Sequence, residues 1–275
     1  MKPRPFDYVR PETADEAVSL LAEHGDAARV LAGGQSLMAM LNLRLAEPDV
    51  LIDISRIKEL DSIREIDGKI EIGAAVTQNK FLAWSALAEK LPLLAKMLPF
   101  VGHFQTRNRG TVCGSIAHAD PSSEIPLALA TLGGEVVLRS KTGTRVMTAK
   151  DFQIDMLTTA READELVIAV RFPVQRSKQV AFREVARRHG DFAIIAISAV
   201  ADGNNQVRLG VGGMTGRPAV LHINAASESA IHDAVAGLAA QLEGYDDIHA
   251  SARMRRDMLT RLAPLVAREA LQCAA

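Results

Sequence analysis

Apolar residues recur at helical spacing near the start of the chain, in the segment TADEAVSLLAEHG (residues 13–25). Thr13 and Glu16 have the spacing of a capping box, and Gly25 is suited to end the helix. A second apolar helix, QSLMAMLNLRLA, and short strands such as VLIDIS complete the first 55 residues. This order of strand, helix, strand, helix and strand predicts a small α/β unit.

Alternation of apolar and polar residues replaces this pattern in the next part of the chain. The segments IREID and KIEIGAAV flank Asp67 and Gly68, which predicts a β-hairpin. A helix is expected to begin near Thr77, and IPLALATLGG (residues 125–134) predicts a short buried helix. EVVLRS and RVMTA are expected to pair, and DELVIAVRFP predicts a strand that ends at Pro173.

The polar stretch VQRSKQ (residues 174–179) is the candidate boundary between two domains. Beyond it, the segments AFREVAR, DFAIIAISAVAD and QVRLGVGGM predict a three-stranded antiparallel meander. Helices are then expected from about Ser227 and Ser251 to the C-terminus. Together with the N-terminal elements, this pattern predicts an α+β protein.

The length and composition are those of a globular protein with two domains of ordinary size. The chain has 275 residues, of which 48% are hydrophobic and 24% are charged. Lys and Arg number 32 and Asp and Glu 33, so the net charge of −1 provides no field to hold nucleic acid. The start, MKPRPFDYVRP, has no apolar leader, and the longest nearly apolar run is far shorter than the ~20 residues that span a bilayer. We therefore expect a cytoplasmic protein without a membrane span.

Two cysteines, Cys113 and Cys273, are present. This number excludes a disulfide framework. It also excludes a cysteine-ligated iron–sulfur cluster on this chain, because such a cluster needs about four thiolates.

The segment TVCGSIAHADP (residues 111–121) gathers side chains from which nucleophilic and metal sites are made. Cys113 and His118 could form a thiolate–imidazolium pair, but no third residue is seen to orient them, and a zinc site lacks half of its ligands. Ser115 has no G-x-S-x-G elbow around it. The alternative is a loop whose small residues let the backbone lie close to a large ligand. Asp120 then suits the hydroxyls of a sugar or sugar alcohol, although it also suits an ordinary Asp-Pro bend.

The segment LAGGQSL lies at a predicted strand-to-helix turn. Free N–H groups and the helix dipole at such a turn favour a phosphate. Gly33 and Gly34 allow the positive φ and the close approach that a phosphate cradle requires. Ser36 can donate its hydroxyl to a phosphate oxygen or cap the helix. An ordinary glycine turn is the alternative.

Neither standard nucleotide motif is present in the chain. No G-x-x-x-x-G-K-S/T occurs, and GVGGMTG (residues 210–216) has Thr215 where a dinucleotide fingerprint needs its last glycine. Two glycine-rich loops about 75 residues apart, around Gly34 and Gly110, instead suggest a long ligand held from both sides. A dinucleotide on this chain would therefore use another fold.

Three segments of the chain are familiar from one protein family: AGGQSLMAMLNLRLAEPDVLIDI, RNRGTVCGSIAHADPSSEIPLALATLGGEVVLRS and AFREVARRHGDFAIIAISAVA. On these segments the chain resembles the FAD-binding medium subunits of the molybdenum hydroxylase family. The family includes bacterial carbon monoxide dehydrogenase, xanthine dehydrogenase and the hydroxylases of aromatic N-heterocycles. The resemblance covers essentially the whole chain.

The resemblance implies a PCMH-type (vanillyl-alcohol-oxidase-like) FAD-binding fold. In this fold two α/β subdomains hold the cofactor, and a C-terminal domain of antiparallel sheet and helices closes over it. The implied domains are residues 1–175, with subdomains of about 1–56 and 57–175, and residues 176–275.

The resemblance also implies which residues bind FAD. The first loop holds the pyrophosphate, and the second follows the ribityl chain and the flavin. Two positions beyond the loops match an apolar and an aromatic residue near the flavin ring, and no catalytic or metal-binding residue is implied. The implied FAD-binding residues are Ala32, Gly33, Gly34, Gln35, Ser36, Leu37, Thr77, Gly110, Thr111, Gly114, Ser115, Asp120, Leu166 and Phe192.

The chain departs from the family pattern at a few positions. Cys113 stands where many members have glycine, and Arg183 stands where members similar to xanthine dehydrogenase often have lysine. A charge role for Arg183 near the flavin is therefore in doubt. His118 and Cys113 become bystanders in this interpretation.

The function implied by the resemblance is electron transfer within a multi-subunit hydroxylase. A large partner would carry the molybdopterin cofactor, a small partner would carry two 2Fe–2S clusters, and FAD on this chain would pass electrons to an external acceptor. The usual assembly in the family is a dimer of heterotrimers. One alternative is a self-sufficient flavin oxidoreductase of the same fold. Another is a protein without flavin, such as a hydrolase that uses Cys113 or Ser115.

Overall fold

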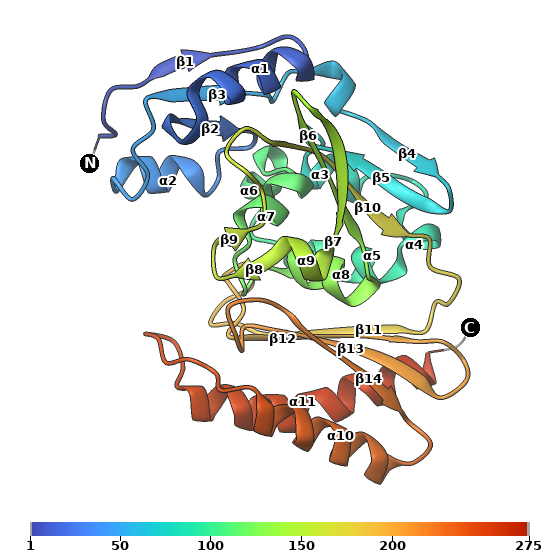
Figure 1. The fold of residues 1–275 in the computed structure, drawn as a ribbon. Helices are drawn as coiled ribbons and strands as arrows, with labels where there is room; N and C mark the ends of the chain where they lie inside the picture. The colour runs from blue at the N-terminus through green and yellow to red at the C-terminus, as the bar shows by residue number, and fades with distance from the viewer. Residues whose placement is uncertain (1, 274–275) are drawn as a thin grey trace.

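The computed structural model describes residues 2–273, so the predicted domain limits at residues 1 and 275 lie outside the described part. Three main β-sheets follow one another along the chain and lie in separate layers (Figure 1). The N-terminal sheet is at the top of the view, the central sheet is in the middle, and the C-terminal sheet lies below with two long helices on its outer face.

The N-terminal sheet has three parallel strands in the order β1-β3-β2. Thr13 caps the first helix, as predicted, by accepting from the amide of Glu16, and Gly25 ends it with a φ of 50°. This layer consists of β1 (Asp7–Val9), α1 (Ala14–His24), the 3-10 helix η1 (Gly25–Ala27), β2 (Ala28–Leu31), α2 (Leu37–Asn42), β3 (Val50–Asp53) and η2 (Lys58–Leu60). The predicted order of strands and helices is confirmed.

The central sheet has five antiparallel strands in the order β4-β5-β10-β6-β7. The hairpin turn has positive φ at Asp67 and Gly68, 50° and 72°, which is the conformation that an Asp-Gly turn favours. The strands are β4 (Ile63–Ile66), β5 (Lys69–Gly73), β6 (Glu135–Ser140), β7 (Gly143–Thr148) and β10 (Leu166–Pro173). Each of the two strand pairs expected from the sequence is confirmed.

Short helices fill the space between the central sheet and the layers around it. They are α3 (Gln78–Leu82), α4 (Leu87–Lys90), α5 (Pro92–Met97), η3 (Leu98–Phe100), α6 (Phe104–Arg109), α7 (Val112–His118), α8 (Glu124–Leu132) and α9 (Ala149–Phe152). A small hairpin of β8 (Gln153–Asp155) and β9 (Thr158–Thr159) follows α9.

The interpretation of residues 111–118 as a loop is wrong, because this segment forms the helix α7. The Thr111 hydroxyl accepts from the amide of Gly114 at 2.9 Å and so caps the first turn. Ala119, with a φ of 52°, ends the helix in the left-handed conformation. Gly114 therefore lies inside a capped helical turn rather than in an open loop.

The C-terminal sheet has four antiparallel strands rather than the three that the sequence predicts. The missed strand, β14, continues the meander by pairing with β13 from Gln206↔Asn224 to Val211↔Ala219. Its sequence, AVLHIN, is short and follows Pro218, which hides it from a search for alternating apolar residues. The elements are β11 (Val180–Val185), β12 (Ile195–Ala201), β13 (Gln206–Gly212), β14, α10 (Glu228–Gln241) and α11 (Ala252–Gln272). The bounds of β14 are Ala219–Asn224.

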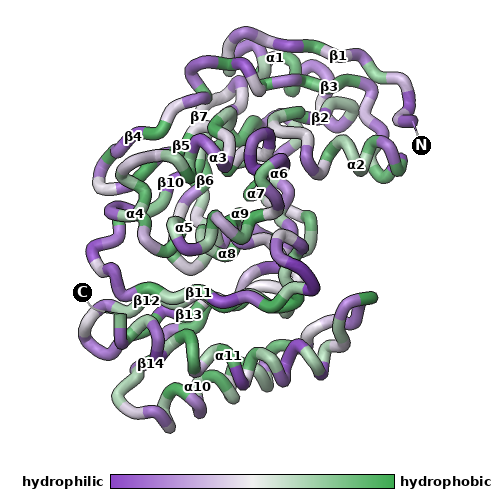
Figure 2. The backbone as a smooth tube through the Cα atoms, turned by 180° about the vertical axis from the view of Figure 1, so that it is seen from behind, coloured by the Kyte–Doolittle hydropathy of each residue, from purple (hydrophilic) through white to green (hydrophobic). Residues whose placement is uncertain are grey.

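The two faces of the C-terminal sheet pack into different hydrophobic clusters. Val180 and Phe182 on β11 belong to the cluster of the N-terminal and central layers, whereas Ala181 belongs to the cluster under α10 and α11. This alternation follows from the period of two residues along a strand. Figure 2 shows apolar and polar segments alternating along α11, as expected for a helix that covers a sheet. The predicted division at residue 175 stays a prediction.

No helix in the described part of the chain is long and apolar enough to cross a membrane.

Candidate functional site

The two glycine segments predicted to hold one ligand lie directly against each other. A Cβ atom added to Gly33 would be 2.2 Å from the carbonyl oxygen of Arg109 and 2.6 Å from the Cα of Gly110. No side chain fits in that space, so glycine is required at position 33. The fold therefore brings together backbone from two layers that are far apart in sequence.

The first segment is a turn whose amide groups are free. None of the amides of residues 33–37 donates to an acceptor within residues 2–273. Gly34 has a φ of 71°, which turns the chain into α2, and Ser36 stands at the N-cap without making a capping bond. The capping role for Ser36 is therefore not observed, and its hydroxyl is left for another partner. A row of free N–H groups at the start of a helix is the chemistry that binds an anion such as a phosphate.

The second segment is held by an isolated β-bridge between Thr77 and Thr111. The amide of Gln78 donates to the carbonyl of Gly110 at 2.8 Å, and the amide of Val112 donates to the carbonyl of Val76 at 3.1 Å. Thr77 and Thr111 each cap the helix that follows them. Their hydroxyl oxygens accept from amides in these caps, so the hydroxyl protons stay available to a ligand.

Gln78 lies between the residues of the second segment, and the sequence interpretation did not select it. Its side chain is buried, and its Oε1 atom has no hydrogen-bond partner in the described structure. Its Nε2 atom lies 3.5 Å from the carbonyl oxygen of Thr111, so the amide group sits at the junction of the two segments. Burying an oxygen without a hydrogen-bond donor costs free energy of folding, so we expect a bound ligand to donate to Gln78 Oε1. The sequence carries no signal for it, since a glutamine after a helix cap is common.

Asp120 lies in the turn between α7 and α8 and takes part in that turn. Its Oδ1 atom accepts from the amide of Ser122 at 2.8 Å, and its carbonyl accepts from the amide of Ser123 at 3.1 Å. The turn role that the sequence left open is therefore present. One carboxylate oxygen is still available, so the ligand role stays a prediction. The carbonyl of Pro121 accepts from the amide of Gly213 at 2.9 Å, which joins this turn to the C-terminal sheet.

The two side chains predicted to contact the flavin ring differ in their exposure. Leu166 is 1% exposed and belongs to the hydrophobic cluster of the first two layers, so its side chain would have to be uncovered to meet a flavin ring. Phe192 is 60% exposed and lies in the loop between β11 and β12. Its ring is free to contact a ligand.

Cys113, His118 and Arg183, which have no predicted role in binding FAD, lie in the following surroundings. Cys113 is buried and its Sγ atom donates to the carbonyl of Ile72 at 3.3 Å. Burial raises the pKa of the Cys113 thiol far above its usual range, which keeps the thiol protonated and unreactive. Burial lowers the pKa of His118, although the charge of Asp120 opposes this. Arg183, whose role near a flavin was in doubt, pairs with Glu269 on α11 at 2.9 Å.

Two carboxyl groups, one buried and one partly buried, lie on α8 and on β11 of the C-terminal sheet. Burial, helped by the charges of Glu184 and Asp120, raises the pKa of Glu124 to about 8, although its own backbone amide and the charge of Arg107 act in the opposite direction. Burial also raises the pKa of Glu184 to about 7, and its Oε2 atom is buried without a partner. Glu124 begins α8 and is 5% exposed. The sequence interpretation missed both, because only folding brings Glu124 on α8 and Glu184 on β11 near each other.

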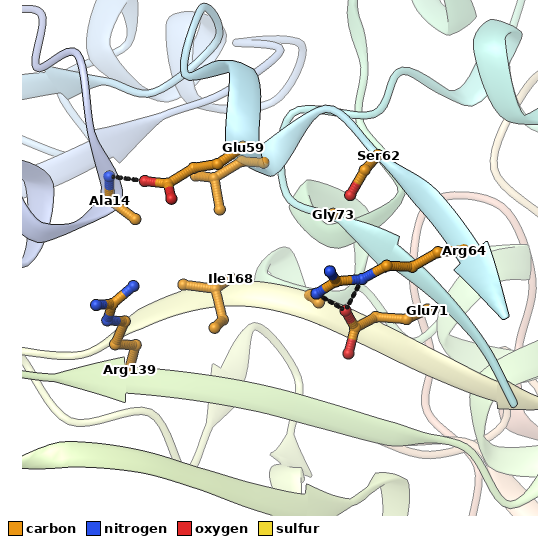
Figure 3. Close-up of a pocket in the computed structure, with 10 residues that line it drawn as sticks. Ala14, Glu59, Ser62, Arg64, Glu71, Gly73, Arg139 and Ile168 are labelled. Atoms are coloured by element: carbon orange, nitrogen blue, oxygen red, sulfur yellow. Dashed lines mark hydrogen bonds and ion pairs between the residues drawn. The ribbon is translucent and has the colours of Figure 1, made fainter. Parts of the chain in front are cut away.

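The cavity of about 200 Å³ shown in Figure 3 lies elsewhere, between α1, β4 and the central sheet. Its charged groups are already paired. Glu59 accepts from the amide of Ala14 at 2.6 Å, and Arg64 pairs with Glu71 at 2.6 Å. The cavity contains none of the residues predicted to bind FAD. It is a gap between layers and not the site.

No group of three or more metal-binding side chains occurs in the described chain. The groups that the structure brings together are the backbone amides of the first segment and the hydroxyls of Thr77 and Thr111, which can hydrogen-bond a phosphate and a polyol. These groups fit FAD, whose pyrophosphate and ribityl chain need them.

Comparison with known proteins shows to which protein family the chain belongs. Residues 4–175 match the family described as the FAD-binding domain in molybdopterin dehydrogenase. The chain belongs to this family, so it is an FAD-binding subunit of the molybdenum hydroxylase type, and that class consists of oxidoreductases.

Individual relatives agree with this class along the whole chain. The chain is 34% identical over 284 residues to the protein named 6-hydroxypseudooxynicotine dehydrogenase complex subunit alpha of Paenarthrobacter nicotinovorans, covering 98% of this chain and 96% of that one. It is 36% identical over 201 residues to the carbon monoxide dehydrogenase medium chain of Hydrogenophaga pseudoflava, covering 73% and 70%. The solved structure of reconstituted CO dehydrogenase from Oligotropha carboxidovorans has a TM-score of 0.93, with 31% identity and 100% of both chains covered.

Proposed function

We propose that this chain is the electron-transfer flavoprotein subunit of a multi-subunit molybdenum hydroxylase. It would take electrons from an iron–sulfur partner and pass them to an external acceptor. The observation that carries the proposal is the row of five unpaired amides at residues 33–37, held against Gly110 by a contact that admits only glycine.

Each group of residues has a distinct part in binding FAD. The turn formed by Ala32, Gly33, Gly34, Gln35, Ser36 and Leu37 donates its N–H groups to the pyrophosphate, and the Ser36 hydroxyl is free to add a further bond. The hydroxyls of Thr77, Thr111 and Ser115 and the free oxygen of Asp120 serve the ribityl chain. Gly110 and Gly114 leave room for it. The ring is assigned to Phe192 and, once uncovered, to Leu166.

When bound, FAD supplies the redox chemistry, because it exchanges electrons with both one-electron and two-electron partners. The chain itself positions the cofactor and limits access to it. No acid, base or nucleophile is needed for this work, which agrees with the buried, protonated Cys113 and the partly buried, bystander His118.

The proposed partners are a small subunit with two 2Fe–2S clusters and a large molybdopterin subunit, in a dimer of heterotrimers. The names of the relatives support this, since they include a complex subunit alpha, a subunit beta and medium chains. Met38, Leu43 and Leu45 lie on or just after α2 and are exposed. These apolar side chains directly follow the pyrophosphate turn, so a partner that covers them would lie next to the cofactor.

The proposal is tested by purifying the tagged chain from its own host and measuring the cofactor content of the fractions. FAD released by heat, together with iron and molybdenum in the same fractions, is the expected result. FAD without metals or partner chains would favour a self-sufficient flavin oxidoreductase of the same fold. A colourless chain that also takes up no added FAD would contradict the proposal.

A further inference from the structure

Arg255, in the first turn of α11, is buried in the C-terminal domain although it carries a charge. Its side chain is 1% exposed, and its guanidinium lies 4.3 Å from the centre of the Tyr245 ring. Nη1 donates to the carbonyls of Gly213, at 2.8 Å, and Ile194, and Nη2 donates to the Asp247 carboxylate at 2.6 Å. Arginine side chains are almost never fully buried unless they are paired, and here both Nη atoms have hydrogen-bond partners.

The two carbonyls come from positions where the C-terminal sheet ends. Ile194 precedes β12 and Gly213 follows β13, so neither carbonyl has a partner in the strand ladder. Gly213 has a φ of 78°, and a Cβ atom placed on it would be 2.5 Å from the carbonyl oxygen of Ile194. This close approach allows a single guanidinium nitrogen to reach both oxygens. Arg255 thus hydrogen-bonds the backbone next to β12 and the backbone next to β13 at this end of the sheet.

We call the hydrogen bonds from Arg255 to Ile194, Gly213 and Asp247 the clamp. Gly213 connects the clamp to the Asp120 turn. Its carbonyl accepts from Arg255, while its amide donates to the carbonyl of Pro121 at 2.9 Å. Pro121 follows Asp120 directly, and the side chain of Asp120 accepts from the amide of Ser122. A shift of Gly213 therefore moves the turn that carries the Asp120 carboxylate.

Ile194 connects the same clamp to the loop that carries Phe192. The amide of Ile194 donates to the carbonyl of Val185 at 2.7 Å, which closes the base of the loop at residues 186–193. Phe192 lies two residues before Ile194. Its backbone position therefore depends on where Arg255 holds the Ile194 carbonyl.

The charge of Arg255 is balanced by Asp247 in the segment before α11. Burial raises the pKa of Asp247, but the amides of Ala250 and His249 and the charge of Arg255 outweigh it, so the carboxyl titrates below its usual range. Asp247 is thus ionised at neutral pH. A buried arginine that is paired and hydrogen-bonded in this way favours one geometry over its alternatives.

We propose that Arg255 is a positioning residue for the FAD site. By holding Ile194 and Gly213 together, it fixes the Asp120 turn and the base of the Phe192 loop, so that the C-terminal domain sets the affinity for FAD. This inference rests on the proposed function, since it takes Asp120 and Phe192 as residues that face FAD.

The test uses the full chain with the substitutions Arg255→Lys and Asp247→Asn. A lysine keeps the charge but cannot form a fork between two carbonyls and a carboxylate. Two variants serve as controls: Arg253→Met, since Arg253 is exposed on the same helix turn, and Leu259→Ala, since Leu259 is buried in the core but its apolar side chain makes none of the hydrogen bonds of the clamp. The measurements are amide hydrogen exchange in the FAD-free chain, the dissociation constant for FAD, and the visible circular dichroism of the bound flavin.

We expect Arg255→Lys to speed exchange of the Gly213 and Ile194 amides and to raise the FAD dissociation constant about tenfold, with a changed flavin spectrum. Asp247→Asn should have a smaller effect in the same direction. Arg253→Met should leave all three measurements unchanged. Leu259→Ala should lower stability by leaving a cavity but keep the affinity for FAD.

Wild-type affinity in Arg255→Lys would overturn the inference, whether or not exchange becomes faster. An equal loss of affinity in Leu259→Ala would overturn it too, because the effect would then be one of stability. A wild-type chain that takes no FAD would contradict the proposed function instead. In that case unchanged exchange in Arg255→Lys would still show that the clamp is absent.

Discussion

Gly33 shows how a single residue can decide whether the two glycine segments lie against each other. A helix or strand tolerates most small residues, but the carbonyl oxygen of Arg109 lies where any Cβ atom of residue 33 would be placed. Cys113 shows the opposite case at the same scale. Its thiol is chemically prominent in the sequence, yet it is buried, bonded to the Ile72 carbonyl and protonated. The importance of Gly33 and the inertness of Cys113 follow from where each residue lies in the fold, and not from the chemical reactivity of its side chain.

Asp120 permits a prediction that separates its turn role from its ligand role. Asp120→Asn keeps an Oδ1 acceptor for the Ser122 amide, so the turn and the melting temperature should not change. The charge is lost, and hydrogen bonds to a charged oxygen are about twice as strong as neutral ones, so the FAD dissociation constant should rise about tenfold. Fluorescence quenching of added FAD measures it. Asp233→Asn, at an exposed position of α10, is the matched control, and equal affinities in the two variants would show that Asp120 only shapes the turn.

At the scale of elements, local signals in the sequence were reliable where the chain acts locally. The Thr13 cap, the Asp67-Gly68 hairpin and the buried helix α8 follow from residues within a few positions of one another. β14 and the helical nature of α7 were missed. A proline hides the start of β14, and a glycine inside α7 resembles a loop.

Contacts between elements could not be predicted from the residues alone. The approach of Gly33 to Gly110 joins segments about 75 residues apart and leaves no local pattern. Gln78 and Glu184 gain their significance from what folding places around them. The resemblance to a family supplied the predicted FAD-binding positions, whereas spacing and periodicity supplied only the glycine turns and left their ligand open.

The burial of the carboxyl groups of Glu124 on α8 and Glu184 on β11 predicts how stability depends on pH. The pKa values of Glu124 and Glu184 are raised to about 8 and about 7 from 4.5. The folded chain therefore holds protons that the unfolded chain has released, so this contribution is complete below pH 4.5 and is lost as pH rises through 7 and 8. The free energy of unfolding of the FAD-free chain should fall by at least about 1 kcal/mol between pH 6 and pH 9.

Urea denaturation at the two pH values measures this change. Glu124→Gln keeps a neutral side chain, so its stability should depend less on pH than that of the wild type. Glu23→Gln, at an exposed position of α1, is the control and should keep the wild-type dependence. If Glu124→Gln and the wild type lost stability equally between pH 6 and pH 9, Glu124 would be ionised in the fold, and the predicted effect of burial would be wrong.

At the scale of the whole molecule, all three layers hold residues of the proposed site. The N-terminal layer provides the amide turn at residues 33–37, the central layer provides the bridge of Thr77 and Thr111, and the C-terminal sheet holds the Asp120 turn through Gly213. Figure 1 shows the three layers stacked in the order in which they occur along the chain. We propose that each layer contacts a different part of FAD, which is long enough to need residues from several layers.

The most direct measurement of this account is a titration of FAD into the purified wild-type chain and the Gly33→Ala variant. Gly237→Ala is the control, since a Cβ atom at that position meets nothing within 4 Å. We predict saturable binding to the wild type and to Gly237→Ala, and a dissociation constant at least about tenfold higher for Gly33→Ala at unchanged helix content. A wild-type chain that binds no FAD, or a Gly33→Ala variant that binds it equally well, would contradict the account.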